Sequence, residues 1–159
     1  MRGHTAAVTS VDWSPNGSWI GTTGRDATIR VWDAGTGATL TGHQGVAYCV
    51  RWSPDGAMLA SSGSATVRLW NFLTMEPIVV CHGHTGYVER VAWRPSGELV
   101  ASASADKIVC LWGAPGGERV ATRGGHTDWV HGVTWSPDGK TLATCGGKDD
   151  GTIRLWQPL

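Results

Sequence analysis

The 159-residue sequence has no excess of charge of either sign. Lysine and arginine together number 13, and so do aspartate and glutamate, so the formal net charge is zero. Proteins that hold nucleic acid mainly through its phosphates carry a basic patch or stripe, and no basic run or acidic tail occurs here. Charge therefore gives little support to nucleic-acid binding, and we expect no nucleic acid as a partner.

Long apolar runs are also absent. No stretch approaches the roughly 20 apolar residues that a membrane-spanning helix requires. The first ten residues, "MRGHTAAVTS", lack the apolar segment of a secretory signal peptide. We therefore expect no membrane partner and a cytoplasmic or nuclear protein.

Signatures of metal, redox and hydrolytic chemistry are missing as well. No Gly-x-Ser-x-Gly, phosphate-binding loop or His-Glu-x-x-His occurs. The run "CHGH" at 81–84 contains zinc-binding residue types, but no second pair of ligands lies nearby in the sequence. No Cys-x-x-Cys pair exists, and every cysteine falls in a strand-like stretch, which predicts small buried thiols. These are Cys49, Cys81, Cys110 and Cys145. We expect no metal and no cofactor.

What the sequence does contain is a fourfold repeat of about 40 residues. Each repeat starts with Gly-His, has a tryptophan nine residues after the histidine, continues into a Pro/Gly turn such as "SPDG", and closes on a second tryptophan. The histidines are His4, His43, His84 and His126. The closing tryptophans are Trp32, Trp70, Trp112 and Trp156. Repetition over the whole chain predicts one structural unit built four times.

Each repeat consists of short strand-like segments separated by turns. Segments such as "VTSVDW" and "VERVAW" are rich in valine and end in a turn with proline second and glycine fourth. Four strands per repeat are typical of β-propeller blades. We predict an all-β protein with a single four-blade unit over 1–159, with repeats at approximately 3–41, 42–82, 83–124 and 125–159. The last blade is expected to lack its outer strand, because only three residues follow Trp156.

The Gly-His pairs, the turns and the closing "VWD", "LWN", "LWG" and "LWQ" together resemble the WD-repeat (Trp-Asp repeat) family. That resemblance implies a structural hydrogen-bonded chain of His, Ser or Thr, Asp and Trp in each blade. The residues concerned are His4, Thr22, Asp26 and Trp32; His43, Ser61 and Trp70; His84, Ser102, Asp106 and Trp112; and His126, Thr144, Asp150 and Trp156. The second repeat is one residue short and lacks the aspartate. In the fourth, Asp149 is the alternative to Asp150.

This recurrence also bears on catalysis. A hydrolytic triad is required once, at one cleft beside an oxyanion hole, whereas His, Asp and Ser or Thr recur here in repeat after repeat. We therefore interpret them as scaffolding and expect no enzyme; a hydrolase using one blade's His and Asp is the rival hypothesis.

Function is expected in residues that the repeat does not require. The resemblance implies a face around a central channel that binds proteins or peptides. Residues on either side of the first buried position of the inner strand point there, as do those before the turn aspartate. The predicted partner-binding residues are Arg25, Tyr48, Tyr87, Glu89, Trp129 and His131. Exposed tyrosine and tryptophan are typical binding anchors. The alternative is that they pack against loops or a subunit interface.

Four blades are few, since the resemblance implies a closed ring of seven or eight. An open arc would expose apolar faces on its first and last blades, which requires a cover. Two copies arranged head to tail give 4 + 4 = 8 blades. We therefore predict a non-enzymatic, self-associating interaction scaffold, a homodimer forming an eight-bladed ring. The alternatives are a half-propeller completed by another chain, a fragment of a larger WD-repeat protein, a four-blade ring, and a purely structural or engineered self-assembling module.

Overall fold

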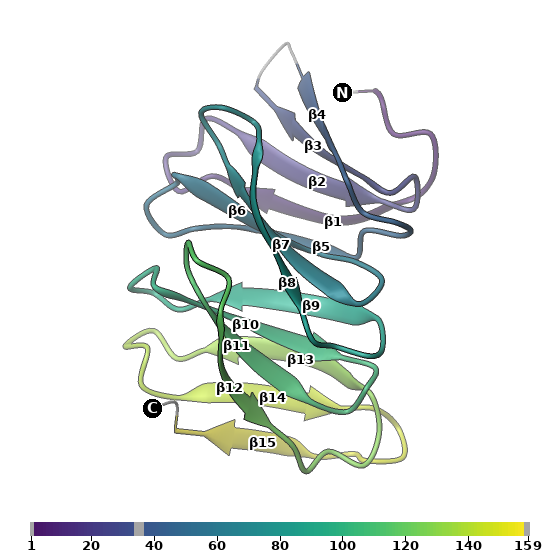
Figure 1. Ribbon diagram of the computed structural model, residues 1–159, viewed down its shortest axis with the longest axis vertical. Coiled ribbons are helices and arrows are strands. Elements are labelled where there is room, and N and C mark those ends of the chain that lie inside the picture. The colour runs from purple at the N-terminus through teal and green to yellow at the C-terminus, as the bar shows by residue number, and fades with distance from the viewer. Residues whose placement is uncertain (1, 34–36, 158–159) are drawn as a thin grey trace.

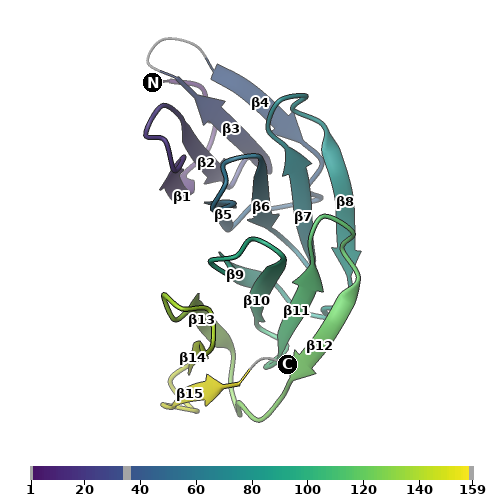
Figure 2. The same cartoon turned by 90° about the vertical axis from the view of Figure 1, so that its left-hand side faces the viewer.

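The protein is built from four antiparallel sheets stacked along an arc (Figures 1 and 2). The computed structural model describes residues 2–33 and 37–157, which form fifteen strands and no α-helix. The described residues therefore contain no helix that is long and apolar enough to cross a membrane. The prediction of an all-β protein made of propeller blades is confirmed.

Each sheet is one blade, and its strands are neighbours in sequence order. Blade 1 contains β1 (Val8–Trp13), β2 (Ile20–Gly24), β3 (Thr28–Trp32) and β4 (Gly37–Thr41). Blade 2 contains β5 (Cys49–Trp52), β6 (Met58–Ser62), β7 (Thr66–Asn71) and β8 (Pro77–His82). Blade 3 contains β9 (Val88–Trp93), β10 (Leu99–Ser104), β11 (Val109–Gly113) and β12 (Arg119–Arg123). Blade 4 has three strands within the described residues, β13 (Val130–Trp135), β14 (Leu142–Gly146) and β15 (Ile153–Trp156).

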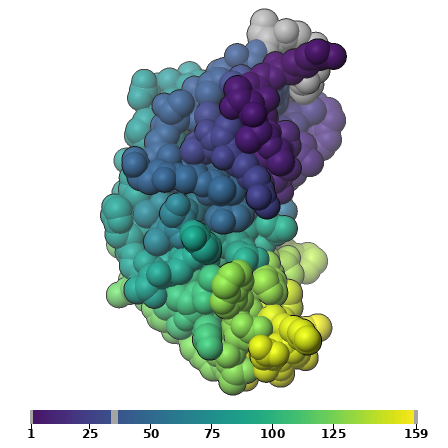
Figure 3. All heavy atoms as spheres, turned by 90° about the vertical axis from the view of Figure 1, so that its right-hand side faces the viewer, coloured from purple at the N-terminus to yellow at the C-terminus, as the bar shows by residue number. Residues whose placement is uncertain are grey.

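The first strands of the blades line the concave side of the arc, and β4, β8 and β12 lie on its convex side (Figure 2). Blades 1 and 4 form the two ends of the arc. In the space-filling view the concave side is hollowed between them (Figure 3). We call the face of a blade that turns toward the preceding blade its front, the opposite face its back, and the contact between two blades a seam.

The turn after each inner strand explains the repeated Ser-Pro-Asp-Gly sequence. In blade 2 the Ser53 hydroxyl donates to the Asp55 carboxylate at 2.6 Å and accepts from the Met58 amide at 2.9 Å. Gly56 has a φ of 73°, a left-handed conformation that glycine adopts at little cost. These bonds turn the chain back tightly, so that β5 and β6 pair antiparallel.

The hydrophobic core is divided among the three seams, with one cluster of buried side chains in each. At the first seam, Ile29 and Val31 on the back of blade 1 lie in one cluster with Val50 and Trp52 on the front of blade 2. All four are at most 6% exposed. Since each core lies between blades, a blade depends on its neighbours for most of its apolar burial.

The cysteines follow the same division. Cys49, Cys81 and Cys110 are buried, as the sequence predicts, whereas Cys145 is exposed. The prediction is wrong for Cys145 because this residue lies on the back of blade 4, which no blade of the described chain covers.

Candidate functional site

A buried hydroxyl group links the polar residues of each blade. In blade 3 the Trp112 indole donates to Ser102 Oγ at 2.8 Å, and His84 Nε2 lies 2.7 Å from the same oxygen. His84 Nδ1 lies 2.8 Å from the Asp106 carboxylate, which also accepts from the Thr85 amide at 2.9 Å. The chain of bonds therefore joins the loop before the blade to its second and third strands.

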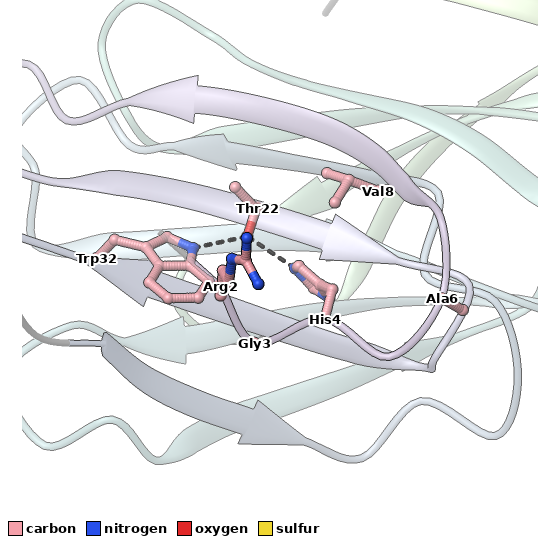
Figure 4. A pocket seen from close by; sticks show the side chains of 7 residues that line it. All are labelled: Arg2, Gly3, His4, Ala6, Val8, Thr22 and Trp32. Carbon is pink, nitrogen blue, oxygen red and sulfur yellow. Dashed lines mark hydrogen bonds between the residues drawn. The ribbon is translucent and has the colours of Figure 1, made fainter.

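Blades 1 and 4 repeat this arrangement. In Figure 4 the Trp32 indole and the His4 imidazole both point toward Thr22, at 2.9 and 2.8 Å. His4 Nδ1 lies 2.9 Å from Asp26. In blade 4 the corresponding residues are His126, Thr144, Trp156 and Asp150. Asp150, and not the alternative Asp149, is the carboxylate that meets the histidine.

In blade 3 the carboxylate can only accept, so a neutral imidazole donates to it from Nδ1 and leaves Nε2 to accept from the hydroxyl. Burial lowers the pKa of His84, against the opposing effect of Asp106. Burial alone would raise the pKa of Asp106, but hydrogen bonds from the Thr85 amide and His84 outweigh it and hold that pKa below its usual value. The pair therefore consists of a neutral histidine and an ionised aspartate at neutral pH.

Blade 2 has only part of this chain. His43 Nε2 and the Trp70 indole both lie 2.8 Å from Ser61 Oγ. The shortened turn of blade 2 supplies no aspartate, and within the described residues Nδ1 of His43 is buried without a hydrogen-bond partner. Burial, followed by the nearby charge of Arg68, lowers the pKa of His43 to about 4.

An arginine guanidinium covers the Gly-His turn of each blade. In blade 2 Arg68 of β7 lies over the Trp70 ring, 6.0 Å from its centroid, and a Cβ placed on Gly42 would lie 2.8 Å from its Nη1. Arg30 and Arg154 hold the same position in blades 1 and 4. Blade 3 has Cys110 in the third strand instead, and the guanidinium that meets Gly83 comes from Arg119 of β12. Sequence analysis missed that Arg119 takes the place of the third-strand arginine, because Arg119 lies on the fourth strand of its blade.

In blade 3 this arrangement is closed to a substrate. Ser102 is fully buried, and its oxygen already bonds tryptophan and histidine, so a substrate carbonyl has no access to it. In the part of the chain that the structure describes, no three His, Cys, Asp or Glu side chains are grouped so as to hold a metal ion.

The six predicted partner-binding residues define the central face: Arg25, Tyr48, Tyr87, Glu89, Trp129 and His131. The structure brings five of them together in two groups. The Tyr48 and Tyr87 rings lie 5.9 Å apart between their centroids. His131 Nδ1 lies 2.7 Å from Glu89 Oε2, and the Trp129 and His131 rings are 6.2 Å apart.

Arg25 stands apart from both groups, but its charge acts on the first. Burial raises the pKa of Tyr48; Tyr87 and Glu89 raise it further, and Arg25 opposes them. Electrostatics therefore connects Arg25 with Tyr48.

A groove of about 490 Å³ lies beside the central face. Tyr87 and Trp129 line it together with Ser64 and Ala65 of the shortened turn of blade 2. Tyr87 is 51% and Trp129 44% exposed, so both rings present apolar surface to solvent. Sequence analysis identified the two aromatics but missed Ser64 and Ala65; the signal for them was the single missing residue in that turn.

Comparison with known proteins assigns the repeats. The family model described as "WD domain, G-beta repeat" matches four segments, residues 1–33, 36–71, 75–113 and 117–157. These segments cover most of the chain. Each ends with the third strand of a blade, and the second, third and fourth begin with β4, β8 and β12, the outer strands of the preceding blades.

Individual proteins match over about 70% of the chain. A ribosome biogenesis protein WDR12 homolog of Nematostella vectensis is 36% identical over 119 residues, which are 70% of this chain and 28% of that protein. The probable cytosolic iron-sulfur protein assembly protein Ciao1 of Culex quinquefasciatus is 33% identical over 74% of this chain and 25% of its own length. Protein HIRA of Xenopus laevis is 33% identical over 72% of this chain and 9% of its own. The matched region thus spans at most 28% of these three relatives.

The first prediction compares blades with and without the aspartate. His84→Ala should lower the free energy of unfolding by about 3 kcal/mol, because it removes the hydrogen bond to the ionised Asp106 carboxylate as well as the bond to Ser102. His43→Ala should cost only about 1–2 kcal/mol, since it breaks the bond to Ser61 alone. Urea denaturation at pH 7 measures both, with His82→Ala on the exposed surface as the control. Equal losses for His84 and His43 would contradict the proposed role of the carboxylate.

The second prediction concerns pH. The unfolded chain protonates His43 near pH 6.5, whereas the folded chain does so only near pH 4, so the unfolded state binds the extra proton in between. The free energy of unfolding should therefore fall as the pH drops from 6.5 to 4, and His43 should account for about 3 kcal/mol of that fall. His43→Gln should show a shallower decline in unfolding free energy over that range. Parallel curves for the two proteins would refute the effect.

Proposed function

Because the chain belongs to the WD domain, G-beta repeat family, we propose that it is a non-enzymatic scaffold that binds a protein or peptide on its central face. The blades hold this face rigidly, since the inner strands of blades 2 and 3 each lie between two seams and that of blade 4 packs into the third. A binding surface on rigid strands loses little conformational entropy when a partner docks. The proposed mechanism is therefore presentation of a preformed surface rather than chemistry.

The observation that supports this proposal is the groove beside the central face. Tyr87 and Trp129 expose large rings on its walls, and the fold does not require an aromatic at either position. Beside them, Glu89 and His131 offer polar groups at the rim. Aromatic anchors flanked by hydrogen-bonding groups are typical of surfaces that bind peptides.

The matched relatives give this proposal a cellular setting. Their names refer to ribosome biogenesis and to cytosolic iron-sulfur protein assembly. We infer a similar role for this chain in the assembly of larger complexes, in the cytoplasm or nucleus. The chain also corresponds to only part of each relative, which favours the alternative that it works as a portion of a larger WD-repeat protein.

Self-association is the second element of the proposal. The largest exposed apolar side chains include Val11 and Trp13 at one end of the arc, and Ile153 and Leu155 at the other. Covering them removes apolar surface from water, which favours association. Two copies would supply eight blades, so we propose a homodimer that closes an eight-bladed ring.

The third prediction tests the central face. Peptides selected from a random library on the immobilised chain should bind Trp129→Ala at least tenfold more weakly, because the variant loses an aromatic anchor worth about 2 kcal/mol. Titration calorimetry gives the dissociation constants, and thermal melts should match the unaltered chain. Leu73→Ala, at a position 87% exposed, is the control and should bind normally. If Trp129→Ala binds the peptides with unchanged affinity, Trp129 is a packing residue and not a binding anchor. A library that yields no binders would favour a purely structural module.

The fourth prediction concerns mass. Light scattering on the purified chain should give a mass of twice 16.8 kDa, because in the proposed dimer the ends of one arc are covered by the ends of the other. A stable monomer of 16.8 kDa would contradict self-association, while leaving the peptide-binding proposal intact.

A further inference from the structure

The three seams inside the chain share one pattern of apolar contact. Large residues on the front of one blade meet a back that combines small residues with aliphatic ones. In the third seam, Val130 and Trp135 of blade 4 lie in one cluster with Ala101, Ala103 and Leu111 of blade 3. The seam is therefore complementary in size, and its two sides are not interchangeable.

Hydrogen bonds fix the register of these seams. The Trp93 indole donates to the carbonyl of Arg51 at 3.0 Å, and the Trp135 indole donates to that of Ala92 at 3.2 Å. In both cases the acceptor directly precedes the matching tryptophan of the previous blade. The first seam differs, because there the backbone amide of Trp52 donates to the Asp12 carboxylate at 2.8 Å.

A second bond lies near the other end of the inner strands. The Ala47 amide donates to the Gly24 carbonyl at 3.2 Å, and the Val88 amide donates to that of Gly63 at 3.1 Å. The matching donor in blade 1 is Val8, and the matching acceptor in blade 4 is Gly146. Both groups lie at the open ends of the arc.

The two ends are the halves of one more such seam. On the front of blade 1, Val11 and Trp13 are each 60% exposed, whereas Val50 and Trp52 at the same positions in blade 2 are 0% and 6% exposed. A hollow of about 420 Å³ lies on that face beside Val8 and Trp32 (Figure 4).

The back of blade 4 carries the other half. Ile153 and Leu155 are 76% and 70% exposed, while Val109 and Leu111 at the same positions in blade 3 are fully buried. Gly132, Thr134 and Ala143 form a shallow hollow of about 360 Å³ beside them. This face therefore has the small and aliphatic residues that the other blade backs present.

Resting on the self-association proposed above, we infer that two copies of this chain meet head to tail, with the front of blade 1 in one copy packed on the back of blade 4 in the other, in the register of the internal seams. The Trp13 indole then donates to the Thr134 carbonyl of the second copy. The Val8 amide donates to the Gly146 carbonyl near the other end of the strand.

Size complementarity favours this pairing over the symmetric ones. A front-to-front contact would place Val11 and Trp13 of one copy against the same two large side chains of the other copy. Back against back would set Gly132 and Ala143 against small residues and leave a void, which costs dispersion contacts. The exposed strand side chains that the contact buries, Val11, Trp13, Ile153 and Leu155, are uncharged, so their burial leaves no unpaired ion. Arg2 is a charged residue that lines the hollow on blade 1. A second copy brings the matching half of each face and leaves neither end uncovered.

The test uses two variants of the 159-residue chain, each blocked at one end. Val11→Arg places a charge on the front of blade 1, and Leu155→Arg places one on the back of blade 4. Each alone should lose the dimer and sediment as a monomer in analytical ultracentrifugation. Mixed in equal amounts they should form a dimer, because the unblocked back of one fits the unblocked front of the other. Leu73→Arg, away from both faces, is the control and should keep the mass of the unaltered chain.

Folding is checked separately from association. Each variant should retain its β-sheet circular dichroism, since the substituted side chains are 60% and 70% exposed. Ile153→Arg, at a 76% exposed position, replaces Leu155→Arg if the latter fails to fold. Trp13→Phe removes only the indole donor and part of the ring, and should weaken the dimer by about fivefold per seam.

The outcomes separate this inference from self-association itself. A dimer that survives Val11→Arg would overturn the inference, because the front of blade 1 would then lie outside the interface. Two monomeric variants that remain monomeric on mixing, at every concentration at which they are soluble, would also overturn it, because the mixture still offers an unblocked front and an unblocked back. A symmetric contact would show instead as one variant that remains a dimer. If the unaltered chain is a monomer, self-association fails and this inference fails with it. If the unaltered chain forms assemblies larger than a dimer while the two mixed variants form a dimer, the result would support the seam but contradict the closure of an eight-bladed ring.

Discussion

Every blade of this protein is apolar on both sides, and the rest of the structure depends on covering both. A sheet that has one wet face can alternate polar and apolar residues along its strands, but a blade between two others cannot. Val31 and Leu69 are therefore fully buried at positions where a solvent-facing sheet would carry polar side chains. The free energy of burial is shared between neighbours, so no blade is an independent folding unit.

Burial on both sides creates a problem for the polar groups inside the blade. The loop that enters each blade, its second strand and its third strand all bring polar atoms to one end of the sheet. A single hydroxyl, such as Ser102 Oγ, connects them by accepting from tryptophan and bonding histidine. Satisfied networks of this kind stabilise and rigidify, whereas partly satisfied ones are costly. Blade 2, with its unpaired His43 Nδ1, is the place where the network is incomplete.

Much of this architecture could be predicted from the sequence, because it depends on local spacing. Glycine, histidine and tryptophan recur at fixed intervals, and those intervals predict the strands, the turns and the partners of the buried hydroxyls. Features that depend on where a neighbouring blade lies could not be predicted in this way. Cys145 resembles the other strand cysteines in sequence, yet it is exposed because no blade of the described chain packs behind blade 4.

The groove at Ser64 and Ala65 was missed for a related reason. A deletion shows in the sequence as a missing aspartate, whereas its effect in space is a gap between that turn and the loops of the next two blades. The residues that line the gap span more than 60 positions of the chain, from Ser64 to Trp129. Their proximity depends on how blades 2, 3 and 4 pack, which repeat spacing alone does not describe.

Arg119 shows how equivalent parts of a repeat protein diverge. Three blades carry the guanidinium above their Gly-His turn on the third strand, and blade 3 carries it on the fourth. Aligned letter by letter, blade 3 has lost a cation; compared in space, it has kept one. Exchanging the third strand of blade 3 with that of another blade would leave blade 3 with two guanidiniums over one Gly-His turn and the other blade with none. For a protein engineer, the smallest segment that can be exchanged safely is therefore the third strand together with the fourth.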